Sequence, residues 1–180
     1  MANSDFYYGA YPAEYSNSLS GIFDMKMRNG NTTDFAHAVQ LGIWGFDLSS
    51  ERPINKKSGS SYLFNYRYSY SGLADKISGS DEGLNYQDLA FKINLPTKKM
   101  GTFTFWGIGL LDKIIQRPED DPKQWETSME RQEQKADFQK GAIGMAHTLS
   151  WNDNTYLRSN IGITFSGTKA ENHIYDKIGR

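Results

Sequence analysis

The chain has 180 residues, a formal net charge of −1 and no cysteine, which fits one domain of ordinary size. The absence of cysteine excludes disulfides, thiol nucleophiles and zinc knuckles. With balanced charge and no local run of basic residues, we expect neither nucleic acid nor an anionic membrane surface to be captured electrostatically. His37, His147 and His173 lack metal-ligand spacing, so we expect no enzyme, no bound metal and no cofactor.

Aromatic residues make up 14% of the chain, yet the mean hydropathy is −0.65. The longest apolar stretch, residues 105–111, is far shorter than the roughly 20 residues of a membrane-spanning helix. The apolar residues are dispersed among polar ones, and the chain is rich in Tyr, Phe, Gly, Ser and Thr. This composition predicts an all-β protein with extended antiparallel structure.

The alternation of side chains predicts about seven strands, at residues 35–43, 45–50, 61–70, 86–95, 102–112, 138–151 and 155–166. The third is the clearest, because Tyr62, Phe64, Tyr66, Tyr68 and Tyr70 alternate with polar residues that include Asn65 and Arg67, which places the aromatic residues on one face. In the fourth, Leu89, Phe91 and Ile93 oppose Lys92. The fifth is apolar on both sides, and its facing is not assigned. Residues 124–140 are charged and have helical propensity, which predicts a short surface helix.

The predicted connections differ in length. Residues 96–100 and 152–154 are short turns, whereas residues 71–84 and 113–136 are long and polar. Short turns and long loops at opposite ends are typical of transmembrane β-barrels. A soluble sandwich or lipocalin-like barrel with its apolar face inside shows the same alternation. The row of tyrosines favours the membrane, because four buried hydroxyls in a small core would each need a partner.

The segment from Tyr8 to Asn31, with Pro12-Ala13-Glu14-Tyr15 and Ser20-Gly21 within it, resembles the end of the plug domain of TonB-dependent outer-membrane receptors of the Bacteroidetes type. The stretches that follow, residues 39–43, 46–54 and 62–68, are similar to the first strands of the receptor barrel. Residues 86–99 share the likeness, and the remainder is barrel-like in pattern only.

The resemblance implies a plug end over residues 1–31 and the N-terminal part of an antiparallel up-and-down transmembrane barrel over residues 32–180. Such receptors close about 22 strands, so it also implies a fragment, with the rest of the plug upstream and further strands downstream. The implied location is the bacterial outer membrane, and the implied function is energised uptake of a bulky nutrient. The implied partners are the lipid bilayer, the TonB complex through the missing N-terminal part, the nutrient and a surface lipoprotein.

The alternation of side chains and the family resemblance together predict where individual residues lie. We expect Tyr62, Phe64, Tyr66, Tyr68, Leu89, Phe91 and Ile93 to face lipid. We expect Asn65, Arg67, Lys92 and Arg158 to face the barrel lumen, and Glu14, Ser20 and Gly21 to belong to the plug end. Arg67 is expected to be a wall residue with an ion-pair partner in the plug segment, for which Glu14 has the right chemistry. We expect Glu119-Asp120-Asp121 to form a solvated loop face rather than a calcium site.

Two function classes remain open at this stage. The first is a part of a transport receptor. The second is a soluble or secreted β-barrel that binds an apolar ligand, with the aromatic stripe lining its pocket. They differ in which face of residues 62–70 meets solvent.

Overall fold

The computed structural model describes residues 4–9, 13–15, 20–70, 83–119, 121 and 125–175. This part of the chain is all-β apart from one short 3-10 helix, η1 (Ala13–Tyr15). No helix in these residues has the length and apolar character needed to span a membrane. Nine strands are present in the described residues: β1 (Asp5–Tyr8), β2 (Gly21–Asp24), β3 (Ala36–Gly42), β4 (Gly45–Asn55), β5 (Ser60–Ser69), β6 (Gly83–Pro96), β7 (Thr102–Gln116), β8 (Gln132–Asn152) and β9 (Thr155–Ile174).

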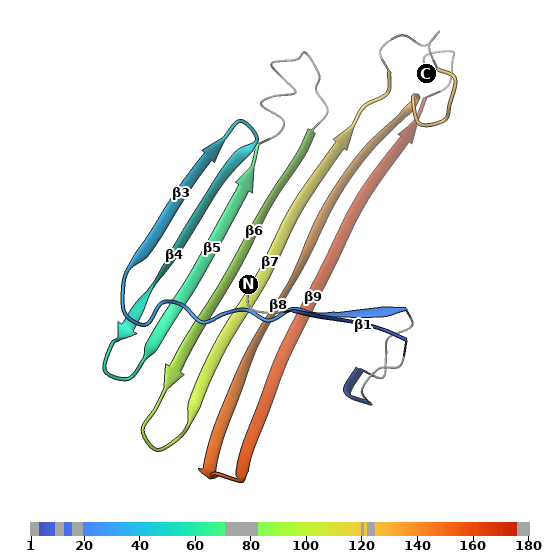
Figure 1. Ribbon diagram of the computed structural model, residues 1–180. Coiled ribbons are helices and arrows are strands. Elements are labelled where there is room, and N and C mark those ends of the chain that lie inside the picture. The colour runs from blue at the N-terminus through green and yellow to red at the C-terminus, as the bar shows by residue number, and fades with distance from the viewer. Residues whose placement is uncertain are drawn as a thin grey trace.

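Seven of these strands, β3 to β9, form one antiparallel sheet in sequence order (Figure 1). This confirms the all-β class and the seven-stranded antiparallel meander. The sheet is not closed within the described residues, because β3 and β9 each pair on one side only. Both edge strands are exposed along their whole length.

The strands are longer than the alternation predicts. β4 continues to Asn55, β7 to Gln116 and β9 to Ile174. The predicted helix within residues 124–140 is wrong, because β8 begins at Gln132 and is paired along β7 and β9. Tertiary pairing overrides the helical propensity of this charged segment. The predicted long segment 71–84 lies outside the described residues except for Gly83 and Leu84.

The strand register assigns every side chain of the sheet to one of two faces, because directly opposite residues share a face. The first, called here the aromatic face, carries Tyr62, Phe64, Tyr66, Tyr68, Leu89, Phe91 and Ile93. It continues through Phe103, Phe105, Met145, Ile143, Ile161, Ile163 and Phe165. The other, called here the polar face, carries Asn65, Arg67, Lys92 and Arg158. The register also assigns β7, with Trp106, Ile108 and Leu110 on the polar face.

The apolar part of the aromatic face forms a diagonal band. In β4, Leu48 is the last apolar residue of this face before the register irregularity between Pro53 and Asn55. The hydrogen-bonded row of Leu48 runs through Tyr66 and Leu89 to Phe165 in β9. Leu48 is the lower end of the band in β4, whereas Phe165, in the same row, is its upper end in β9, the end nearest the long loops. From Phe165 the apolar run of β9 continues toward the short turns as far as Leu157. The lower edge of the band therefore shifts by eight residues between β4 and β9.

The upper edge of the band shifts by only two residues between β4 and β9. Its upper end in β4 is Phe46, whose row reaches Gly167 in β9, two residues beyond Phe165. The mean shift is thus about one residue per strand. With about 3.3 Å per residue and about 4.8 Å between strands, this corresponds to a band tilted by roughly 35° against the hydrogen-bond rows.

The N-terminal strands lie apart from the sheet. β2 pairs only with β1, in a two-stranded sheet that joins Phe6 to Phe23 and Tyr7 to Ile22. The chain then leaves β2 and crosses in front of the larger sheet before entering β3 (Figure 1). The regular strand covers Gly21–Asp24 only, whereas the sequence analysis predicts extended structure to Arg28.

Candidate functional site: the polar face and its crossing segment

Residues 25–35 connect β2 to β3 across the polar face, and we call them the crossing segment. It contacts the side chains of Glu51 in β4 and Lys92 in β6. Both residues are paired with Leu63 of β5, which lies between them. The four predicted lumen residues Asn65, Arg67, Lys92 and Arg158 share this face. The structure therefore places the N-terminal part and the polar side chains on the same side of the sheet.

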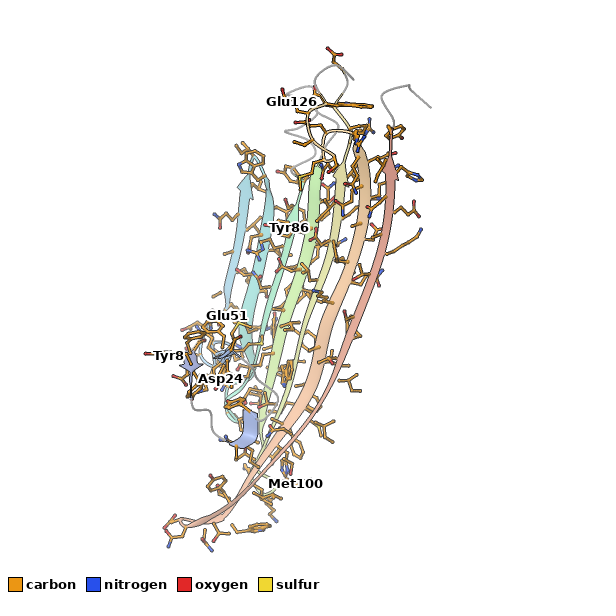
Figure 2. The ribbon with its side chains drawn as sticks, turned by 90° about the vertical axis from the view of Figure 1, so that its right-hand side faces the viewer. Tyr8, Asp24, Glu51, Tyr86, Met100 and Glu126 are labelled. Carbon is orange, nitrogen blue, oxygen red and sulfur yellow. The ribbon has the colours of Figure 1, made fainter. Side chains whose placement is uncertain are left out.

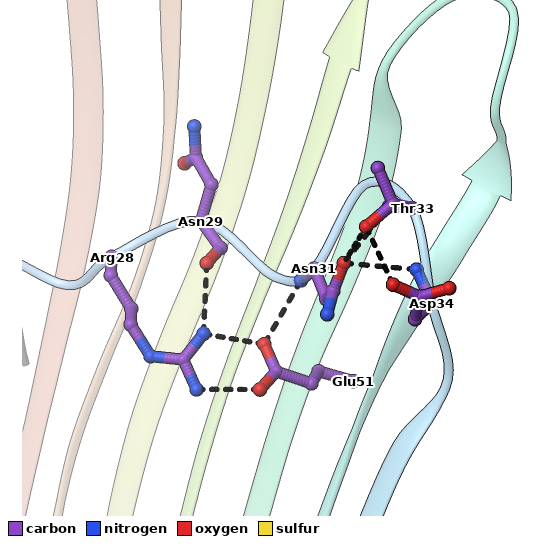
Figure 3. A network of polar contacts seen from close by, with 6 residues as sticks. All are labelled: Arg28, Asn29, Asn31, Thr33, Asp34 and Glu51. Carbon is purple, nitrogen blue, oxygen red and sulfur yellow. Dashed lines mark hydrogen bonds and ion pairs between the residues drawn. The ribbon is translucent and has the colours of Figure 1, made fainter.

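Glu51 is the centre of the polar contacts of the crossing segment (Figure 3). Its carboxylate accepts two hydrogen bonds from Arg28, that of Nη2 to Oε1 measuring 2.8 Å, and a third from the backbone N–H of Asn31 at 2.9 Å. Arg28 also donates to the carbonyl of Asn29 at 3.2 Å. Bidentate arginine–carboxylate pairs are geometrically selective, so Glu51 fixes the position of the segment as well as binding it.

Asn31 also shapes the turn that leads into β3. Its Oδ1 accepts hydrogen bonds from the backbone N–H groups of Thr33 and Asp34 at 2.9 and 3.0 Å (Figure 3). Asparagine favours such local side-chain turns. The same residue thus joins the wall contact to the change in chain direction.

Two further contacts bring the segment close to the sheet. The Lys92 ammonium donates to the carbonyl oxygen of Met27 at 2.6 Å. Gly30 is buried and packs its backbone against the peptide between Tyr62 and Leu63, where a Cβ would lie 3.1 Å from the Leu63 nitrogen and closer still to the Tyr62 carbonyl. Glycine is therefore required by the close approach of two backbones.

Among the described residues, Arg67 has its ion-pair partner within the sheet and not in the N-terminal part. Its Nε donates to Asp88 of the neighbouring strand at 2.8 Å, and its guanidinium lies 5.6 Å from the ring centroid of Tyr86. In the part of the chain that the structure describes, the ion pair Arg28–Glu51 joins the N-terminal part to the sheet. The side chain of Glu14 lies outside the described residues, whereas Ser20 is exposed and Gly21 begins β2.

Lys26 stabilises the N-terminal hairpin rather than the sheet. Its ammonium lies 2.6 Å from Asp5 and 3.3 Å from Asp24, which are opposite each other in β1 and β2. These contacts, led by the hydrogen bond to Asp5, raise the pKa of Lys26 above its ordinary 10.5. The other side of the hairpin exposes Phe6, Tyr8 and Phe23.

In the described part of the connection after β7, Trp125 is buried and donates from Nε1 to the carbonyl of Glu119 at 2.8 Å. Glu130 accepts backbone hydrogen bonds from Glu126 and Thr127. These two backbone donors lower the pKa of the Glu130 carboxyl. No group of three potential metal ligands occurs in the described residues, and Asp120 of the predicted acidic loop lies outside them.

No protein-family model, curated protein or solved structure matches the chain.

Proposed function

We propose that the seven-stranded sheet is part of the wall of a transmembrane β-barrel of the TonB-dependent receptor type, which takes up a bulky nutrient through the outer membrane. The observation that carries this proposal is the diagonal apolar band of the aromatic face. Strands of transmembrane barrels tilt by about 35–45°, so a band level with the bilayer must run obliquely across the hydrogen-bond rows, as this one does.

The dimensions of the band support the proposal. In β9 it extends from Leu157 to Phe165, nine residues, and about 9–11 residues of a tilted strand cross a bilayer. Ile161, Ile163 and Phe165 are 65%, 62% and 53% exposed. An apolar surface this large and continuous needs a cover, and lipid provides it.

Charged residues border the band on the same face. Beyond its upper edge the register places Lys113, Asp137 and Lys169 in one row and Lys135 opposite Glu171 in another. At its lower edge in β4, Arg52 lies 4.7 Å from the ring centroid of Phe35. Charged side chains facing lipid cost about 2–4 kcal/mol at the bilayer centre and little near its surfaces, so their confinement to the borders fits a membrane.

The polar face supports the receptor assignment within this class. The crossing segment is bound to it through Arg28–Glu51 and Lys92–Met27, which is the side where a plug would lie. Figure 2 shows the lower end of the β8–β9 hairpin bending toward the side of the labelled Tyr8 and Asp24. The wall of a barrel bends toward its lumen, so this curvature also supports the proposal that the polar face is the inside.

The chain has no cysteine, so single cysteines can test the proposal directly. We would place a nitroxide label at Ile143 or Met145 on the aromatic face and at Ala142 or Ala146 on the polar face, in the full chain reconstituted into lipid vesicles. We expect labels at 143 and 145 to be relaxed by oxygen dissolved in lipid, and labels at 142 and 146 by a water-soluble nickel complex. The reverse pattern would favour a barrel with an apolar interior that binds an apolar ligand.

A further inference from the structure

The fold brings together four lysines that are distant in the sequence. Lys56 and Lys57 occupy the turn between β4 and β5, and Lys98 and Lys99 the turn between β6 and β7. Because Ser61 pairs with Asn94 and Asn94 with Thr104, the two turns are neighbours at one end of the sheet, the lower end in Figure 1. All four lysines are exposed, and none forms an ion pair with the described residues.

Both turns have defined conformations that hold the lysines at their tips. Asn55 Oδ1 accepts the backbone N–H of Lys57 at 2.9 Å, and Thr97 Oγ1 accepts that of Met100 at 3.0 Å. Each turn ends in a glycine with positive φ, Gly59 at 71° and Gly101 at 75°. Such turns limit the loss of backbone freedom when the lysines bind a partner.

Lys98 and Lys99 border the apolar band, whereas Lys56 and Lys57 lie beyond its lower edge in β4, at the same end of the sheet. Leu95 and Phe103, its last apolar residues in β6 and β7, are opposite each other and flank the second turn. Tyr62 follows the first turn closely. Exposed Met100, labelled at the lower end in Figure 2, lies beside the lysine pair. The second turn therefore lies at the level of the lipid phosphates when the apolar band is immersed in a bilayer.

Charge is also distributed unevenly between the two ends. Among the described residues, the short turns contain four lysines and one acidic residue, Asp153. The described part of the connection after β7 contains two arginines, Arg117 and Arg131, and four acidic residues, Glu119, Asp121, Glu126 and Glu130. Within the described residues, the short turns are therefore net basic and the connection after β7 is net acidic. The expectation that no anionic surface is attracted was based on the net charge of the whole chain, whereas these lysines concentrate positive charge at one end of the sheet.

We propose that Lys56, Lys57, Lys98 and Lys99 form a binding surface for the phosphate groups of anionic lipids in the leaflet at the short-turn end of the sheet. The proposal rests on the proposed membrane-spanning function. The lysine heads contact phosphates while the adjacent apolar residues contact acyl chains. The surface fixes the depth of the sheet in the bilayer and distinguishes the two leaflets.

The test measures binding of the full chain, diluted from urea, to vesicles of phosphatidylcholine alone or with phosphatidylglycerol. A lysine near an anionic surface contributes about fivefold to binding, so we expect at least a roughly tenfold preference for the anionic vesicles that falls with salt. The variant K56Q/K57Q/K98Q/K99Q should lose this preference and keep its binding to phosphatidylcholine. The control K113Q/K135Q/K140Q/K169Q removes the same charge from the other end and should keep the preference.

Each other outcome has a defined meaning. The proposal would be overturned if the unmodified chain showed no preference for anionic vesicles. It would also be overturned if the variant K56Q/K57Q/K98Q/K99Q kept the preference, or if the control lost it. Suppression by inorganic phosphate but not by chloride at equal ionic strength would show that the lysines bind free phosphate instead. Failure to bind phosphatidylcholine would contradict the proposed membrane function itself, because that binding depends on the aromatic face and not on the lysines.

Discussion

At the scale of single residues, the pair Arg28–Glu51 is the main polar link between the crossing segment and the sheet. Glu51 is 17% exposed and Arg28 46%, so solvent screens the pair in part. We expect R28Q and E51Q to show a coupling of about 1 kcal/mol in a double-mutant cycle of unfolding. Each single variant should also increase proteolytic cleavage within residues 25–35.

The matched control is Lys169–Glu171, which is 75% and 51% exposed and lies within one strand. A double-mutant cycle of unfolding for this pair should give a coupling free energy close to zero. K169Q should also leave proteolytic cleavage of the crossing segment unchanged. Equal coupling in the two cycles would mean that Glu51 has no special part in holding the segment.

Glu130 gives the connection after β7 a dependence on pH. Its carboxyl has a pKa below the ordinary 4.5 because it accepts backbone hydrogen bonds from Thr127 and Glu126. A lowered folded-state pKa means that the stabilisation is present above the unfolded pKa and is lost as pH falls through the folded value. We expect the amides of residues 126 and 127 to lose protection from hydrogen exchange below about pH 4. E130Q should weaken this dependence, and E119Q should retain it.

At the scale of strands, three aromatic side chains cover glycines of neighbouring strands. Phe91 lies over Gly107, Phe165 over Gly141 and Trp106 over Gly144. The first two pairs are on the aromatic face and the third is on the polar face. The ring occupies the space of the missing side chain, and the glycine fixes where the ring lies.

Gly107 and Gly109 in β7 provide a matched test of this arrangement. A Cβ at Gly107 would lie 2.8 Å from Cζ of Phe91 and closer still to Cε1, whereas a Cβ at Gly109 would meet nothing within 4 Å. We expect G107A to destabilise the reconstituted chain by about 1–3 kcal/mol. G109A should be neutral or stabilising by about 0.5–1 kcal/mol. Urea unfolding in lipid vesicles measures both, and equal effects would contradict the packing argument.

The sequence predicts the middle of each sheet strand better than its ends. Alternation is clear where one face is apolar, as from Tyr62 to Tyr68. It disappears in the upper parts of β8 and β9, where the register pairs Asp137 with Lys169 and Lys135 with Glu171. Polar residues on both faces remove the alternation of polar and apolar residues that identifies a strand. The sequence at the start of β8 therefore has the pattern of a charged surface helix.

The contacts of the polar face were harder to predict than the faces themselves. The alternation alone is enough to group Asn65 with Arg67. Arg28 and Glu51 are 23 positions apart in segments without a shared pattern, and only the path of the chain across the sheet brings them together. Gly30 is likewise inconspicuous in the sequence, because its role depends on the nearby backbone of β5.

At the scale of the whole molecule, the two faces and the two ends of the sheet differ in consistent ways. One face has a tilted apolar band with charged borders, and the other binds the N-terminal part of the chain. At one end the described turns carry four lysines, and at the other the described part of the connection after β7 carries more acidic than basic residues. A sheet between two layers of water needs none of these differences, whereas a wall between lipid and an aqueous lumen needs the first two.

The open sheet also predicts how the chain behaves without a membrane. β3 and β9 have unpaired edges, and the aromatic face exposes residues such as Leu41 at 77% and Ile161 at 65%. Unpaired edges and exposed apolar surface both promote association, so we expect aggregation in detergent-free buffer at neutral pH and recovery of a dispersed β-rich form on addition of detergent. Size-exclusion chromatography and circular dichroism measure this. A monodisperse monomer near 20.4 kDa with a sharp thermal transition in detergent-free buffer would overturn the receptor assignment, because a cooperative monomer must bury that face within itself. It would favour the soluble module that binds an apolar ligand.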